Sequence, residues 1–225
     1  MPRRLLACLT SGLLAIASLS ACGGSAGNGL ASKSADQIVA AAVKAADSAK
    51  SVHVAGSLKR SGQAMALDVA LQAGKGARGT ISVAGLTFEF IELPGVFYIK
   101  ANGQFLRHFG NSSVSRLAGR WLRSPPTASG LSGLAGFTNL HQVFSSLLTN
   151  HGVLKKAGST TFDGQTVLAL RDTTKGGTLY VASTGTPYPV GVDNTTEGVL
   201  RLDRYNQPVS LTPPPNAIDL SKAGA

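Results

Sequence analysis

Apolar and polar residues alternate with a period of two along most of the chain, and this alternation predicts β-strands. The clearest case is residues 86–92, where Leu86, Phe88 and Phe90 share one face. Strands separated by Gly- or Pro-containing turns are predicted at residues 52–59, 64–72, 80–84, 86–92, 96–101, 153–157, 166–172, 178–183, 189–193 and 198–203, with a last strand near Val209. The gaps between successive strands are too short for crossover connections, so we expect an antiparallel meander.

Two longer segments have apolar residues at helical spacing instead. The first begins at Ser34, an N-cap residue with Gln37 at the spacing of a capping box, and a helix should run to about residue 50 with a narrow face made mostly of alanine. The second covers about residues 138–149 and carries a wide apolar stripe. A short helix is expected over residues 111–117, and residues 218–220 should tie down the C-terminus.

These elements predict an α+β fold built on a large curved antiparallel sheet of about ten or eleven strands. A helix face made mostly of alanine allows close packing against a flat surface, most simply that of a β-sheet. About 200 residues follow the N-terminal segment described next, which is enough for one sizeable core and too few for two comfortable domains. We therefore expect residues 34–225 to form a single domain.

The N-terminus has the layout of an export signal. Arg3 and Arg4 precede an apolar run over residues 5–19, which is shorter than the roughly 20 residues that a membrane-spanning helix needs. The run closes with Leu-Ser-Ala-Cys-Gly, which resembles the lipobox of bacterial lipoproteins, where the cysteine thiol is acylated and the chain is cut just before it. The sequence therefore predicts a lipoprotein signal peptide over residues 1–21 and lipidation of Cys22.

Cysteine usage bears on the alternative, an ordinary signal peptide that leaves a free thiol. Cys8 would be removed with the signal, so Cys22 would be the only cysteine left and no disulfide could form within the chain. Acylation is the simplest use for such a thiol, and two or three acyl chains would anchor the protein durably to a membrane. Residues 22–33, rich in Gly, Ser and Ala, are expected to form a flexible tether.

The net positive charge gives only weak information about the kind of molecule that the protein binds. The net charge is +10, and removal of Arg3 and Arg4 leaves 19 basic against 11 acidic residues, or +8. Such a surface favours anionic lipid head groups or cell-wall polymers outside the cytoplasm, where nucleic acid is not a partner. Because no dense run of Lys and Arg occurs, a solvated cationic surface explains the charge equally well.

Familiar catalytic and metal-binding motifs are missing. A G-x-G-x-x-G match over residues 74–79 precedes a strand rather than a helix, so it predicts a hairpin turn instead of a dinucleotide site. The four histidines, including His53, lack zinc-ligand spacing and are expected on the surface or in caps. Glu89 and Glu92 are three apart in a strand and should point to opposite faces. We therefore expect no enzyme, no metal and no cofactor.

Several stretches resemble the LppX and LprAFG family of actinobacterial lipoproteins, which share the LolA-like fold. Residues 95–100, followed by residues 119–122, resemble the family's strand and the tryptophan segment after it. Residues 179–181, followed by residues 185–190, resemble its Gly-x-Pro hairpin. The resemblance covers essentially all of the chain after the signal segment. It implies a half-barrel whose concave face is covered by helices, enclosing an apolar cavity that holds the acyl chains of lipids or lipoglycans.

The cavity that this resemblance implies would be lined by apolar residues of the strands and of the second main helix. The predicted lining is Met65, Leu67, Val69, Ile81, Val83, Phe88, Phe90, Phe97, Ile99, Leu140, Val143, Phe144 and Leu147. Small side chains on the first helix would leave room for a lipid tail. The alternative is tight packing of helix on sheet with no void, in which each of these residues belongs to a plain core.

The resulting functional hypothesis is a lipid-anchored, non-enzymatic protein on the extracytoplasmic face of the cell membrane. It would bind acylated lipids or lipoglycans and carry or transfer them through the envelope, with an envelope transporter as a candidate partner. The alternative is a sensor or protein-interaction module on the same fold without a lipid cargo, because a fold does not fix a function. No motif in the sequence names the lipid head group.

Overall fold

The structure is a computed structural model that describes residues 27–60, 62–109, 114–128 and 139–222 of the 225-residue chain. The described residues form one open, mixed sheet of twelve strands. These are β1 (Ser51–Arg60), β2 (Gln63–Gln72), β3 (Gly76–Val83), β4 (Leu86–Leu93), β5 (Val96–Ala101), β6 (Leu122–Ser124), β7 (Leu154–Phe162), β8 (Gln165–Asp172), β9 (Thr178–Ala182), β10 (Pro189–Asn194), β11 (Gly198–Asp203) and β12 (Ile218–Asp219).

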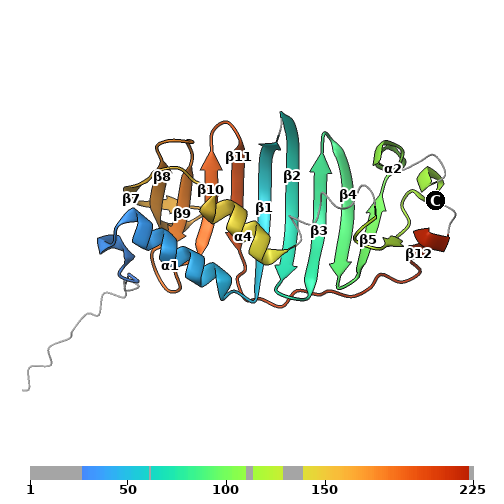
Figure 1. Cartoon of the computed structure of the whole chain (residues 1–225), viewed down its shortest axis with the longest axis horizontal. Helices are drawn as coiled ribbons and strands as arrows, with labels where there is room; N and C mark the ends of the chain where they lie inside the picture. The colour runs from blue at the N-terminus through green and yellow to red at the C-terminus, as the bar shows by residue number, and fades with distance from the viewer. Residues whose placement is uncertain (1–26, 61, 110–113, 129–138, 223–225) are drawn as a thin grey trace, which may run out of the picture.

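The strands follow one another across the sheet in the order β12-β6-β5-β4-β3-β2-β1-β11-β10-β9-β8-β7 (Figure 1). Neighbouring strands are antiparallel except for β12 and β6, which pair in parallel. β1 pairs with both β2 and β11, so the two meanders of the chain meet at this strand.

Three α-helices occur within the described part of the chain: α1 (Ala35–Asp47), α2 (Gly103–Phe109) and α4 (Leu140–Thr149). Short 3₁₀ helices are η1 (Leu30–Ser32), η2 (Val114–Leu117) and η4 (Leu220–Lys222). The predicted capping box at the start of α1 is confirmed. The Gln37 N–H donates to the Ser34 hydroxyl oxygen at 3.3 Å, and the Ser34 N–H donates to Gln37 Oε1 at 3.1 Å.

The helices cover one face of the sheet. α1 and α4 lie across the half that runs from β7 to β1, and α2 follows β5 (Figure 1). α1 contacts α4, β7 and β10, while α2 contacts β4. Ile38 of α1, Phe105 of α2 and Phe144 of α4 belong to the same buried cluster as the strand residues Val69 and Phe90. We call the side that carries Val69 and Phe90 the helix face, and the opposite side the outer face.

The predicted α+β fold with a large sheet is confirmed, with twelve strands instead of ten or eleven. The additional strands, β6 and β12, are very short, and β12 lies in the predicted C-terminal tie-down. The prediction of a strand near Val209 is wrong. The chain between β11 and β12 runs along the lower edge of the sheet there (Figure 1), and Pro208 and residues 213–215 lack the N–H that a ladder requires.

Helix α2 lies in a segment for which no helix or strand is predicted from the sequence. Asn102 Oδ1 accepts a hydrogen bond from the Phe105 N–H at 2.9 Å, and Phe105 and Leu106 are buried. Of the short helix predicted over residues 111–117, the first three residues lie outside the described residues and the rest form η2. α2 is therefore an additional helix, held against the sheet by the burial of Phe105 and Leu106.

The segment before α1 is packed against the sheet from residue 27 onward. Gly27 bridges to Thr184, and Leu30 is buried. The Asn28 side chain donates to Ala182 O at 2.9 Å and to Gly185 O at 3.2 Å. Residues 27–33 are thus held in place, and only residues 22–26, which lie outside the described residues, remain of the predicted tether.

Candidate functional site

The structure brings the thirteen predicted cavity residues into one apolar cluster. Nine of them are buried, and the other four are partly buried: Met65, Val83, Val143 and Leu147. All nine strand residues share the helix face, and the four residues of α4 pack onto it. The predicted residues therefore lie together, and most of them contact protein rather than solvent.

The register of the strands extends the helix face across the sheet. Residues directly opposite one another on neighbouring strands share a face. One such row crosses seven strands: Leu202, Val54, Val69, Gly79, Phe90, Ile99 and Leu122. Each of its six side chains is at most 5% exposed. The row contains no polar side chain, so an uninterrupted apolar strip runs from β11 to β6.

Aromatic rings are concentrated at β4 and β5. The rings of Phe90 and Phe97 are stacked, with centroids 5.6 Å apart and planes 2° apart. Phe88 lies 4.6 Å from Phe105 of α2, which joins the helix to the sheet. On the neighbouring strand β3, Gly79 lies directly opposite Phe90 and Ile81 lies opposite Phe88. The ring of Phe90 therefore has a small neighbour on this strand, and the ring of Phe88 has a large one.

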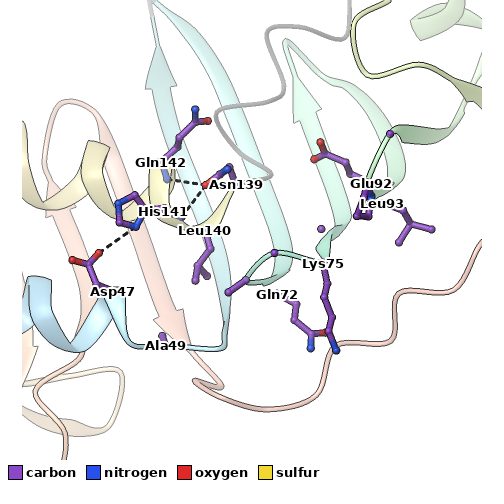
Figure 2. Close-up of a pocket in the computed structure, with 15 residues that line it drawn as sticks. Asp47, Ala49, Gln72, Lys75, Glu92, Leu93, Asn139, Leu140, His141 and Gln142 are labelled. Carbon is purple, nitrogen blue, oxygen red and sulfur yellow. Dashed lines mark hydrogen bonds and ion pairs between the residues drawn. The ribbon is translucent and has the colours of Figure 1, made fainter.

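A pocket of about 540 Å³ opens at one end of the helix face, and this volume is within the usual range for small-ligand sites. It lies between the end of α1, the start of α4, the β2–β3 turn and the β4–β5 turn (Figure 2). Its lining is Asp47, Ala49, Gln72, Ala73, Gly74, Lys75, Gly76, Glu92, Leu93, Pro94, Gly95, Asn139, Leu140, His141 and Gln142. Only Leu140 among these was predicted as a cavity residue, because the turns that build the pocket are polar.

Glu92 is the charged member of a second row on the helix face. The row consists of Val52, Leu71, Ala77, Glu92, Phe97 and Ser124. Glu92 Oε2 is inaccessible to solvent and has no hydrogen-bond partner among the described residues. Glu89, by contrast, lies on the outer face with Oε1 3.2 Å from Lys100 Nζ. The prediction that these two carboxylates point to opposite faces is confirmed.

The rim of the pocket is held by contacts between α1 and α4. Asn139 Oδ1 accepts hydrogen bonds from the N–H groups of His141 and Gln142, at 3.0 and 3.2 Å, and so caps α4. His141 Nδ1 lies 3.3 Å from Asp47 Oδ1 at the end of α1 (Figure 2). Both of these side chains are exposed, so their contact contributes little to stability.

A buried histidine on the outer face was not predicted. His53 is 8% exposed, with Nδ1 2.6 Å from Asp203 Oδ1 and Nε2 2.9 Å from Asp68 Oδ1. Arg204 Nη2 lies 2.7 Å from His53 Nδ1. The expectation of a surface or capping histidine is wrong here, because the register of the sheet brings together partners that are distant in sequence. The ring links β1 to β2 and β11, which is a structural role.

A smaller pocket of about 240 Å³ adjoins Leu147 and Asp172. The Asp172 carboxylate accepts hydrogen bonds from the N–H groups of Gly152 at 2.6 Å and of Thr174 and Lys175 at 2.8 Å. The N–H groups of Lys175 and Gly152 have the largest part in lowering the pKa of Asp172 below its ordinary value. This carboxylate is satisfied by its own loop, which marks it as structural.

Two features bear on anchoring and metal chemistry. Cys22, the predicted lipidation site, lies outside the described residues. The helices that the structure describes include none with the length and apolar character needed to cross a membrane. In the same part of the chain, no group of three or more His, Cys, Asp or Glu side chains is arranged to hold a metal ion.

Comparison with known proteins gives matches in structure alone. No family model matches the chain, and a search of curated proteins finds no match. LprF from Mycobacterium bovis superposes with a TM-score of 0.56 at 16% identity, over 79% of this chain and 95% of LprF. Lipoprotein LppX from Mycobacterium tuberculosis gives a TM-score of 0.52 at 18% identity, over 80% of this chain and 100% of LppX.

These matches show that the chain shares the fold of LprF and LppX. The predicted resemblance to the LppX and LprAFG family, with its LolA-like architecture, is therefore confirmed for the fold.

Proposed function

We propose that this protein is a lipid-anchored component of the cell envelope that binds acylated lipids or lipoglycans between its sheet and helices and carries them. The fold shared with LprF and the lipoprotein LppX supports this proposal. The resemblance in sequence implies the same kind of cargo. A single domain over residues 34–225, acylated through Cys22 and exposed on the extracytoplasmic side of the membrane, is the form in which the protein would act.

The apolar strip across seven strands is the observation that carries the proposal. A plain structural sheet also has an apolar face, but here the strip crosses seven strands, from β11 to β6, and three helices cover it: α1 and α4 over the half between β7 and β1, and α2 over β4 (Figure 1). Acyl chains would lie along this face and replace contacts that the core residues now make with one another. Each Å² of apolar chain removed from water would contribute about 25 cal/mol.

The buried side of α1 would allow acyl chains to replace contacts between core side chains. Ala42 and Ala46 are completely buried, and Ala49 is nearly so. Methyl side chains present a smooth surface, so a small outward movement of α1 would admit a chain without rearranging large side chains. A lipid transporter of the envelope is the candidate partner that would deliver or receive the cargo.

The packed segment before α1 sets the distance to the membrane. Gly27 is fixed beside Thr184, and it is five positions after the acylated Cys22 along the chain. An extended chain spans at most about 3.6 Å per residue, so this link reaches roughly 18 Å. The β9–β10 hairpin would therefore stay close to the bilayer surface, which would favour direct uptake of lipid from it.

The dense packing of the predicted lining favours a second candidate. Nine of the thirteen residues are buried against other side chains. A protein that keeps this core closed would act as a sensor or protein-interaction module on the same fold. This alternative requires no movement of α1 or α4.

Native mass spectrometry of the full-length lipoprotein, purified from membranes and then freed of detergent, separates the two candidates. We expect one or two non-covalent lipid masses on the wild-type protein. Substitution of the buried Ala42 by Leu should reduce their occupancy, whereas Leu at the exposed Ala40 of the same helix should leave it unchanged. Protein that carries no lipid while its circular dichroism shows a folded state would support the module instead.

A further inference from the structure

Glu92 has a buried carboxylate oxygen for which the described residues offer no hydrogen-bond donor. Its Oε2 is shielded from solvent and lacks a hydrogen-bond partner in the described part of the chain. Buried polar atoms are almost always paired, and a carboxylate oxygen left unpaired is costly. Figure 2 shows the carboxyl group of Glu92 directed away from the side chain of Lys75, the nearest basic residue on the β2–β3 turn of the pocket. Because Glu92 lines the pocket, a rotation of its side chain would turn this oxygen towards a ligand that donates a hydrogen bond.

The remaining polar groups of the pocket indicate what kind of donor fits. Gln72 and Gln142 each carry an amide that both donates and accepts hydrogen bonds. Asp47 accepts, and its partner His141 donates or accepts according to its tautomer. Such a mixture suits hydroxyl groups, which also both donate and accept hydrogen bonds, better than groups that only donate or only accept them.

An anionic head group fits this pocket poorly. The N-terminus of α4 points into the region, but Asn139 Oδ1 already takes the first free N–H groups of the helix. Glu92 would repel a phosphate at close range, and Asp47 adds a second negative charge at the rim. Lys75 would favour an anion, but its side chain is directed away from Glu92 (Figure 2).

The position of Glu92 connects the pocket to the apolar face. Glu92 is directly opposite Phe97 on β5 and Ala77 on β3, and the ring of Phe97 stacks on Phe90. A molecule with its tail on the rings and its polar end at the carboxylate would match both surfaces. An amphiphile has this form.

We infer that the pocket at the end of the helix face holds an uncharged, hydroxyl-bearing head group, one of whose hydroxyls donates a hydrogen bond to Glu92 Oε2. This inference rests on the proposed function, because the same ligand would place its acyl chain on the apolar strip. It adds a selection rule: lipids whose polar end is a sugar or another polyol bind, and lipids whose polar end is a phosphate are rejected.

Isothermal titration of the full-length protein with octyl β-glucoside and with octyl phosphate, both below their micelle concentrations, tests the rule. We expect the glucoside to bind more tightly than the phosphate. Glu92→Gln should weaken glucoside binding about tenfold, since a hydrogen bond to a charged carboxylate is replaced by a weaker one to a neutral amide oxygen. The matched control is Glu89→Gln, on the outer face of the same strand, which should bind like the wild type.

Tighter binding of octyl phosphate, no binding of octyl β-glucoside, or equal glucoside affinity in wild type and Glu92→Gln would overturn the inference. These results are independent of the lipid masses measured on the purified protein. Lipids that co-purify, together with an unaltered Glu92→Gln variant, would leave carriage intact and remove the head-group rule. Glucoside binding that depends on Glu92, in a protein that carries no lipid, would support the head-group rule and remove carriage.

Discussion

Glu92 and Phe97 occupy directly opposed positions on β4 and β5, so a carboxylate lies beside a buried aromatic ring on the same face of the sheet. Towards the middle of the sheet, the next residues on the same face are Phe90 and Ile99, which are apolar and buried, whereas the exposed turn at Pro94 lies on the other side of the pair. The pair marks the place where the apolar strip ends and the polar pocket begins. A ligand that uses both surfaces must lie across it.

Replacement of Glu92 by Leu should stabilise the unliganded protein. The substitution removes an unpartnered buried oxygen and adds apolar surface next to Phe97, so we expect the free energy of unfolding to rise by about 1 kcal/mol. Chemical denaturation measures this change. Glu89→Leu is the control, and its effect should stay within about 0.5 kcal/mol because that residue is on the surface. A Glu92→Leu variant less stable than the wild type would show that the carboxylate is satisfied in solution.

Gly79 should tolerate no side chain. A Cβ at this position would lie 2.1 Å from Asp68 O and 2.7 Å from Val69 Cα, both backbone atoms of β2 that cannot move independently of the sheet. We expect Gly79→Ala to lower the free energy of unfolding by about 2–4 kcal/mol, as for other overpacked core sites. Gly27→Ala, whose Cβ would have its nearest contact at 3.6 Å, should change stability little. Equal thermal midpoints for the two variants would contradict the close approach of β2 and β3.

The C-terminal tie-down should depend on acid pH. Hydrogen bonds from the Ser221 side chain and from Arg123 lower the pKa of Asp219 from 3.8 to about 2. A carboxyl group with a lowered pKa stabilises the fold above its ordinary pKa, and this stabilisation is lost as the pH falls towards 2. The pairing of β12 with β6 should therefore persist at pH 4 and weaken near pH 2.

Titration of the Asp219 carboxyl carbon by NMR measures this pKa. Arg123→Gln should move the pKa upward, towards 3.8, because the guanidinium NH2 group lies 2.7 Å from Asp219 Oδ2. Arg120→Gln, a nearby exposed arginine, should not move it. An Asp219 pKa near 3.8 in the wild-type protein would mean that the ion pair does not form in solution.

The sequence predicts those parts of the fold that depend on neighbours along the chain. Period-two alternation locates the long strands, and the Ser34–Gln37 capping box starts α1. The glycine-rich stretch 74–79 covers the end of the β2–β3 turn and the start of β3 rather than a nucleotide loop. Each of these signals is contained within a few residues. The choice of one face for the apolar side chains of the strands follows from the same alternation.

The remaining features depend on contacts between distant segments. Helix α2 forms because Phe105 packs onto Phe88, and β12 forms because a long edge segment brings residue 218 to Leu122. His53 is buried by carboxylates that are 15 and 150 positions away. The pocket around Glu92 was not foreseen for the same reason, since four separate elements build it and none of them carries a recognisable motif.

The central claim is that acyl chains lie on the helix face. A lipid with a nitroxide in its acyl chain, added to protein with labelled Ile and Val methyl groups, tests this by NMR. We expect strong broadening of the methyl signals of Val69 and Ile81 on the helix face, and little effect on Ile91, which is also buried but lies on the outer face. Equal broadening of all three residues, or broadening of none, would contradict it.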